Sequence, residues 1–216
     1  MKRLMFILPF LLGATIVAHS QRIVKKSVEV QGKKVEMKFS FADSISIETW
    51  DKNTIDLQVS VNIDDNRYND HYDLKVKEEG NSLQLTEDVD FKSIPKEKSE
   101  NNHGVNSYIR YKLKVPAKLD FDLNTISGNI VLKGTLGTIS INSISGFVDY
   151  TIPLKQKASI DLSTISGNVY SDLKFDEKPG KDISWVGTKQ KLTLNGGNTP
   201  ITLKTISGDI FLRKGH

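Results

Sequence analysis

The chain has 216 residues, no cysteine and a formal net charge of +4, and charged residues make up 26% of the sequence. The lack of cysteine excludes disulfides and thiolate metal sites, so stability must come from a buried core, which a chain of this length can supply. Lysines and carboxylates are interspersed, a pattern typical of a solvated sheet face that argues against a nucleic-acid-binding surface.

The first twenty residues have the pattern of a secretory signal peptide. Lys2 and Arg3 precede an apolar run that ends at Val17, and the small residues Ala18 and Ser20 suit a cleavage site. A retained anchor is the alternative, but the run is shorter than the roughly 20 apolar residues of a membrane span. We therefore expect cleavage near Ser20, a mature chain of net charge +2 without a membrane span, and a location in the periplasm, on the cell surface or outside the cell.

Residues 21–119 contain several runs in which apolar and polar residues alternate. Examples are the segments 34–39, 54–61 and 108–115. Alternation with a period of two indicates half-buried β-strands. We expect either irregular opening rungs or a small β cap that covers the first edge of a repeat array, because open arrays need such covering. In both cases the region should form one continuous domain with the following residues.

One polar stretch, residues 87–106, interrupts these strands. It is rich in charge and contains Pro95 and Gly104. Loops of this length are uncommon in a compact domain unless they are functional or disordered. We expect a mobile loop, which is either a solvated insertion or a contact for a partner.

Residues 120–216 contain an internal repeat with a Thr/Ser-Ile-Ser-Gly core. Its glycines are Gly128, Gly146, Gly167 and Gly208, at spacings of 18, 21 and 41 residues. The last spacing is about twice the others, so it predicts a degenerate copy at Gly187. Rungs of about 20 residues are too short for propeller blades, and none contains an amphipathic helix. The sequence therefore predicts an all-β protein that forms a parallel β-solenoid.

Each rung reads as a strand, a tight Ser-Gly corner and a second strand. A corner this tight favours φ > 0, which glycine adopts without steric cost. The hydroxyl side chains should stack from rung to rung and bond backbone groups at the corner. The predicted structural corner and ladder residues are Thr125, Ser127, Gly128, Ser143, Ser145, Gly146, Thr164, Ser166, Gly167, Gly187, Thr205, Ser207 and Gly208.

The copies TISGNI, SISGFV, TISGNV and TISGDI resemble a bacterial putative-adhesin family of unknown function. The segment from Ile45 to Asp51, followed by Ile55 to Val59, is similar to the opening hairpin of that family. The resemblance implies an exported β-solenoid associated with the envelope, with no catalytic residues to carry over. The chain departs from the family pattern at the rung of Trp185 and in the 87–106 insertion.

The residue pattern predicts no enzyme, metal or cofactor site. A nucleophilic serine needs a neighbouring base, yet the corner serine recurs without a histidine. The histidines His71, His103 and His216 lie in separate polar segments with no metal-ligand spacing. Polysaccharide-active β-helices use paired carboxylates, and Asp122 and Asp161 hold equivalent positions in their rungs. Ser140 occupies the rung between them, which puts the carboxylates about two rungs, or roughly 10 Å, apart.

Two further groups are open to a structural or a binding interpretation. Trp50 and Trp185 stack on sugars if exposed and fill a core otherwise. The residues after the corners form a mixed exterior column, which is either a solvated turn or a set of ligand contacts: Asn129, Phe147, Asn168, Thr188 and Asp209.

These observations predict a non-catalytic, adhesin-like envelope module that displays a repetitive β surface to an unknown protein or glycan. The alternative is a periplasmic scaffold or envelope-stress sensor, and a polysaccharide-active enzyme is the third hypothesis. Ligand and contact residues are not predicted. Accessibility from outside the cell separates an adhesin from a scaffold.

Overall fold

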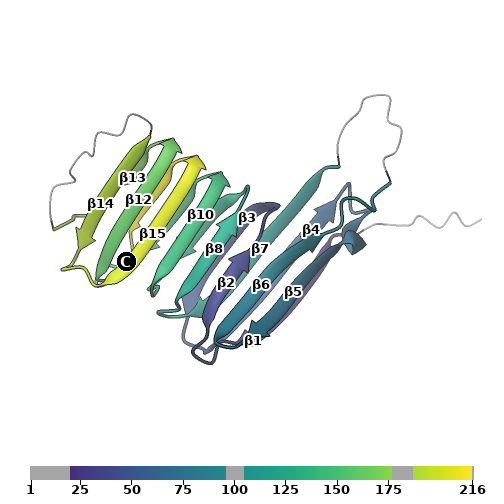
Figure 1. The fold of residues 1–216 in the computed structure, drawn as a ribbon, viewed down its shortest axis with the longest axis horizontal. Helices are drawn as coiled ribbons and strands as arrows, with labels where there is room; N and C mark the ends of the chain where they lie inside the picture. The colour runs from purple at the N-terminus through teal and green to yellow at the C-terminus, as the bar shows by residue number, and fades with distance from the viewer. Residues whose placement is uncertain (1–19, 96–104, 177–186, 216) are drawn as a thin grey trace, which may run out of the picture.

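The computed structural model describes residues 20–95, 105–176 and 187–215. Two eight-stranded sheets form an elongated molecule with the core between them (Figure 1). Sheet A has the order β1-β4-β7-β3-β9-β11-β16-β13, and sheet B has the order β14-β12-β15-β10-β8-β2-β6-β5. The elements are β1 (Arg22–Glu29), β2 (Lys34–Lys38), β3 (Ala42–Trp50), β4 (Thr54–Ile63), the short 3-10 helix η1 (Asn69–His71), β5 (Tyr72–Glu79), β6 (Ser82–Val89), β7 (Ser107–Pro116), β8 (Phe121–Thr125), β9 (Asn129–Lys133), β10 (Ile139–Ser145), β11 (Val148–Ile152), β12 (Ala158–Ser166), β13 (Val169–Ser171), β14 (Thr188–Leu194), β15 (Thr199–Ser207) and β16 (Ile210–Lys214).

The all-β prediction is confirmed, and the alternating pattern explains the strands. In β8, Phe121 and Leu123 are fully buried while Asp122 and Asn124 face outward. In the facing β9, Ile130 and Leu132 are likewise buried. Burying one face of each strand removes apolar surface from water at about 25 cal/mol per Å². None of the described residues forms a helix long and apolar enough to cross a membrane.

Two strands and a corner form one coil of the array. β8 lies in sheet B, the chain turns at Gly128, and β9 returns in sheet A. The coils β10–β11, β12–β13 and β15–β16 repeat this path, and equivalent strands pair in parallel. The central part of both sheets is therefore a parallel stack.

The spatial order of the coils differs from their order in sequence. The last coil, β15–β16, lies between β10–β11 and β12–β13. Equivalent inward residues share one register: Ile139, Ile201 and Ile160. Stacking the coils in spatial order or in sequence order would therefore bury equivalent side chains. A turn at 195–198, whose four residues all have positive φ, joins β14 on one side of β12 to β15 on the other.

The prediction of a degenerate parallel rung at Gly187 is wrong. β14, which follows Gly187, pairs antiparallel with β12 at the edge of sheet B. Leu173 and Phe175 pack against the core after β13, and Asp176 donates its backbone N–H to Thr193 O. β14 begins beside the corner of β12 and runs away from it, so its direction is reversed. Trp185 lies outside the described residues.

The N-terminal region continues both sheets. β2 and β3 pair in parallel with β8 and β9, and β6 and β7 pair in parallel with β2 and β3. The strands β1, β4 and β5 are antiparallel to their neighbours. A wholly parallel solenoid is therefore incorrect, because antiparallel strands occur at both ends of the molecule.

The predicted loop 87–106 is shorter than its pattern indicates. β6 extends to Val89, because Glu87 pairs with Leu74 of β5 in the sheet. Beyond the strand, Ile94 is buried and Phe91 packs edge-on against Phe41. Residues 96–104 lie outside the described part of the chain.

Candidate binding surface

The Thr/Ser column of the corners lies inside the molecule. Thr125 Oγ1 donates to Phe39 O at 2.7 Å, and Ser143 Oγ donates to Ser145 O at 2.8 Å. Thr164 and Thr205 donate to the backbone oxygens of Gly208 and Gly146, at 2.9 and 3.4 Å. All four side chains are buried. Each hydroxyl therefore satisfies a carbonyl that the turn removes from the strand ladder.

The second hydroxyl column behaves differently. Ser145, Ser207 and Ser166 pair in register, but all three are exposed, and within the described residues their hydroxyls bond no protein group. Only Ser127 bonds the backbone, donating to Ala42 O at 3.2 Å. The expected hydrogen-bonding role of this column is therefore not seen at three of its four positions, since these hydroxyls face solvent.

The corner glycines stack with little space between them. A Cβ placed on Gly146 would lie 2.4 Å from Gly128 O, and one on Gly208 would lie 2.1 Å from Gly146 O. Gly167 lacks the positive φ that the sequence predicts, yet its Cβ would lie 2.1 Å from Gly208 O. Gly187 has φ +75° beside Thr164. The corner glycines therefore have one requirement in common: the backbones of neighbouring coils approach too closely to leave room for a Cβ.

Outside this column, the isoleucine of each copy forms an exposed row. Ile126, Ile144, Ile206 and Ile165, in spatial order, are 45–49% exposed. We call this row the isoleucine ridge. It follows the edge of sheet B where β8, β10, β15 and β12 end (Figure 1). The sequence interpretation missed the ridge. Strand alternation reveals it, because Leu123 and Thr125 point into the core and Ile126, one residue later, must point outward.

An open groove of about 550 Å³ runs beside the ridge. One side of the groove is lined by Asn124 and Asn142, and Asn142 Nδ2 donates a hydrogen bond to Asn124 Oδ1 at 3.2 Å. Lys204 continues this row on the next strand. These residues stand two positions before the isoleucines, so both rows lie on the outer face of sheet B. The groove therefore has one apolar wall and one polar wall.

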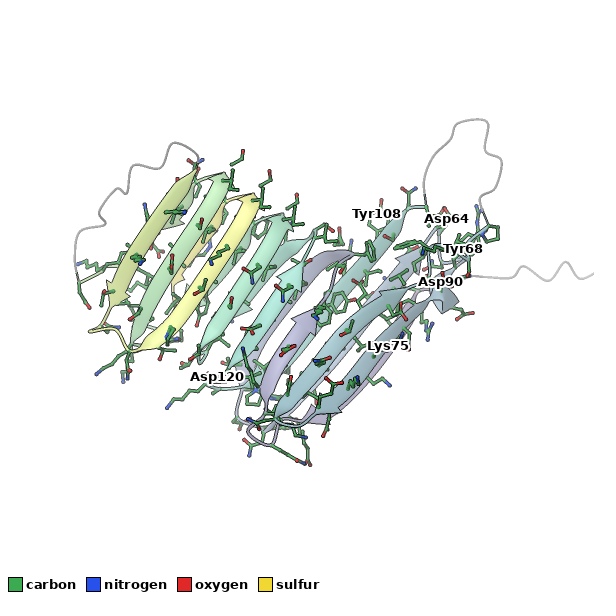
Figure 2. The ribbon with its side chains drawn as sticks, in the orientation of Figure 1. Asp64, Tyr68, Lys75, Asp90, Tyr108 and Asp120 are labelled. Atoms are coloured by element: carbon green, nitrogen blue, oxygen red, sulfur yellow. The ribbon has the colours of Figure 1, made fainter. Side chains whose placement is uncertain are left out.

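A larger groove, of about 890 Å³, lies at the opposite edge, which Asp120 marks in Figure 2. Its polar groups contact one another. Lys34 Nζ lies 2.6 Å from Asp122 Oδ2, and this contact raises the pKa of Lys34. Asp120 accepts the backbone N–H of Thr138 at 2.6 Å. These groups are engaged within the chain, which makes the ridge the stronger candidate.

The structure does not bring the carboxylates of the enzyme hypothesis together. β10 and β15 both lie between Asp122 and Asp161, so the expected separation of two rungs is wrong and becomes three strand spacings, about 14 Å. That exceeds the separation of glycosidase carboxylates. His71 lies in η1, and His103 and His216 lie outside the described residues. Over the ranges the structure describes, no three His, Cys, Asp or Glu side chains gather as a metal site.

The residues after the corners are partly used within the fold. Asn129 Oδ1 accepts the backbone N–H of Phe147 at 3.3 Å, and Asp209 Oδ1 accepts that of Asn168 at 2.8 Å. Phe147 contacts Phe211 edge-on. Thr188 pairs with Thr164 as the first residue of β14. The column mainly links neighbouring corners.

Trp50 is also engaged within the chain. Its indole Nε1 donates to Thr54 O at 2.8 Å, and its side chain is half-buried. The ammonium groups of Lys52 and Lys114 lie 4.7 and 5.8 Å from the ring centroid. Sugar stacking on this ring would have to compete with two cations.

A polar network closes the N-terminal end of the core. Tyr111 donates to Glu87 Oε1 at 2.8 Å, and the backbone N–H of Phe41 donates to Oε2 at 2.7 Å. Tyr72 and Tyr111 hydroxyls lie 3.2 Å apart, so Tyr72 acts as the donor to Tyr111. Burial raises the pKa of Glu87, although both hydrogen bonds act in the opposite direction.

Glu87→Gln is expected to flatten the pH dependence of stability. Because the folded-state pKa of Glu87 is raised, the folded protein binds this proton more tightly than the unfolded chain does. The contribution is complete below the ordinary value of 4.5 and is lost as the pH rises through the folded pKa. Urea unfolding between pH 4 and pH 8 should show a smaller decline in the variant. Glu79→Gln on the surface controls for the lost charge, and equal declines in all three proteins would contradict the expectation.

The fold and the surface together define an all-β protein of stacked two-strand coils that exposes an apolar ridge along its corners. Residues 116–213 match the family model of Toastrack DUF4097, in agreement with the family resemblance of the corner copies. No curated protein matches the chain.

The fold is shared with a solved structure. A putative cell adhesion protein from Clostridium sporogenes has a TM-score of 0.55 at 12% identity, over 91% of this chain and 100% of that protein. A putative adhesin from Bacteroides fragilis has a TM-score of 0.30 at 10% identity, with coverages of 91% and 99%. A putative lipid binding protein from Parabacteroides distasonis has a TM-score of 0.28 at 14% identity, with coverages of 90% and 97%.

Proposed function

We propose that the chain is an exported, non-catalytic envelope module, adhesin-like in use, that binds a macromolecular partner through the isoleucine ridge. The observation that carries the proposal is the row of four adjacent isoleucines, each nearly half exposed. Soluble proteins seldom leave a continuous apolar patch uncovered unless it contacts something. The signal-like first twenty residues and the fold shared with a protein named for cell adhesion support the proposal.

The mechanism is display on a stiff support. Each coil contributes one isoleucine, and parallel pairing sets the spacing between neighbours at about 4.8 Å. Buried Thr and Ser hydroxyls and stacked glycines hold every corner at the same height. Because the β-solenoid-like stack is rigid, the ridge binds without a large ordering cost.

Binding to isolated cell envelopes tests this proposal. Purified residues 21–216 should sediment with envelopes of the producing cells, and a variant with Ile126→Ser, Ile144→Ser and Ile206→Ser should remain in the supernatant. Losing three half-exposed isoleucines should weaken binding on the order of a hundredfold. Circular dichroism would verify that the variant keeps its strands.

The matched control removes three apolar side chains that do not form a row. Leu154, Val131 and Ile23 are 51%, 41% and 45% exposed and lie apart, in the turn after β11, in β9 and in β1. Their replacement by serine should leave sedimentation unchanged. Equal loss in both triple variants, or no sedimentation of the original chain, would count against the ridge. Protease treatment of intact and lysed cells then separates a surface adhesin from a periplasmic scaffold.

A further inference from the structure

The row next to the isoleucine ridge is basic and contains no acidic residue. Across the outer face of sheet B, Lys189, Ser163, Lys204, Asn142, Asn124 and Lys38 follow one another in register. Within the described residues, none of the three lysines forms an ion pair with a carboxylate. We call this row the lysine row.

The carboxylates closest to this surface along the strands stand in the next row. No Asp or Glu is among the described residues that line the groove between the two rows. The nearest acidic row along the strands contains Glu36, Asp122 and Asp161, which stand two residues before Lys38, Asn124 and Ser163. Asp122 already contacts Lys34. The groove therefore presents positive charge beside apolar side chains, and charge complementarity requires an anionic partner.

Position favours a flat, extended partner. The isoleucines lie next to the exposed serines that end the strands at the corners, and the lysines lie one step further from the corners. The order is thus apolar at the rim and cationic behind it. A lipid leaflet has the matching order, with an apolar interior beneath anionic phosphates. A polyanionic chain would use the lysines but leave the isoleucines exposed.

We propose that this surface docks on an anionic lipid membrane. Ile126, Ile144, Ile206 and Ile165 insert at the level of the headgroups and upper acyl chains, and Lys38, Lys204 and Lys189 contact lipid phosphates. The inference rests on the proposed function, since it names the partner of the same ridge. Attachment is peripheral and reversible, because one short apolar row inserts far less surface than a membrane span.

Flotation with protein-free vesicles tests the inference. Residues 21–216 should float with vesicles of equal parts phosphatidylglycerol and phosphatidylcholine and should bind pure phosphatidylcholine much more weakly. Raising the salt concentration should weaken binding, because salt screens the electrostatic attraction between the lysines and the anionic lipids. The triple Ile→Ser variant should lose binding on the order of a hundredfold.

Charge reversal separates the contribution of the lysine row. Each basic residue near an anionic surface contributes roughly fivefold in affinity, so Lys38→Glu with Lys204→Glu should weaken binding at least roughly thirtyfold. Lys155→Glu with Lys157→Glu changes the net charge equally at exposed sites between β11 and β12. This control should bind as the original chain does.

The outcomes distinguish the inference from the proposed function. Sedimentation with envelopes without flotation on anionic vesicles would overturn the lipid inference and leave a protein or glycan partner for the ridge. Flotation that both lysine variants lose equally would overturn it as well, because net charge alone would then explain binding. Failure of envelope binding itself would overturn the proposed function.

Discussion

Gly146→Ala should destabilise the protein by about 3 kcal/mol or more, because it combines a strained backbone with a collision. Gly146 has φ +99°, and its Cβ would lie 2.4 Å from the carbonyl oxygen of Gly128. That oxygen belongs to the backbone of the neighbouring coil, so it has little freedom to move. Urea unfolding should show a large fall in the transition midpoint.

Gly32→Ala is the matched control for this prediction. Gly32 also has positive φ, at +73°, but no heavy atom lies within 4 Å of its ideal Cβ. The substitution should therefore cost only the backbone strain, about 1 kcal/mol. Equal losses at Gly32 and Gly146 would show that conformation alone explains the corner, and that the close packing of coils contributes nothing measurable.

A fragment limited to residues 116–216 should not fold cooperatively, although it contains the whole family match. In the intact chain, Val35 and Met37 of β2 pair with Phe121 and Leu123 of β8, and all four are fully buried. β3 likewise covers β9. Removing β1 to β7 opens one edge of both sheets and uncovers the end of the core, which favours aggregation.

Thermal unfolding followed by circular dichroism checks this expectation. Residues 21–216 should give one cooperative transition, whereas the fragment should give none and should bind a hydrophobic dye. A cooperative transition in the fragment, with the same near-ultraviolet spectrum per aromatic residue, would mean that the matched segment is an independent domain. The coils before residue 116 would then be an accessory.

Periodicity predicted the strands and the corners because both follow from local rules. Phe121 and Leu123 alternate with the polar residues Asp122 and Asn124, and a tight corner needs a glycine. The coil β2–β3 does not show the repeat in its sequence, because Ser40, Phe41 and Ala42 stand where the repeat has Ile-Ser-Gly. This coil still contacts the next corner, because the backbone carbonyl of Ala42 accepts a hydrogen bond from the Ser127 hydroxyl.

The spatial order of the coils could be identified only from the three-dimensional structure, where the isoleucine ridge was also recognised. The copies bury equivalent isoleucines and leucines in the same register, so sequence alone does not say which copy lies beside which. The direction of β14 depends on the end of β12 beside which it begins, at Thr164. The ridge was predictable in principle from parity at Ile144, but the lysine row joins residues whose neighbours depend on coil order.

The position of the last coil also constrains when the protein can fold. β12 has β14 on one side and β15 on the other, and both follow it in the chain. β12–β13 thus has no neighbouring strand until residues 188–214 are available. Contacts between segments far apart in sequence slow folding. A chain emerging N-terminus first therefore completes its C-terminal half only after its last strand has emerged.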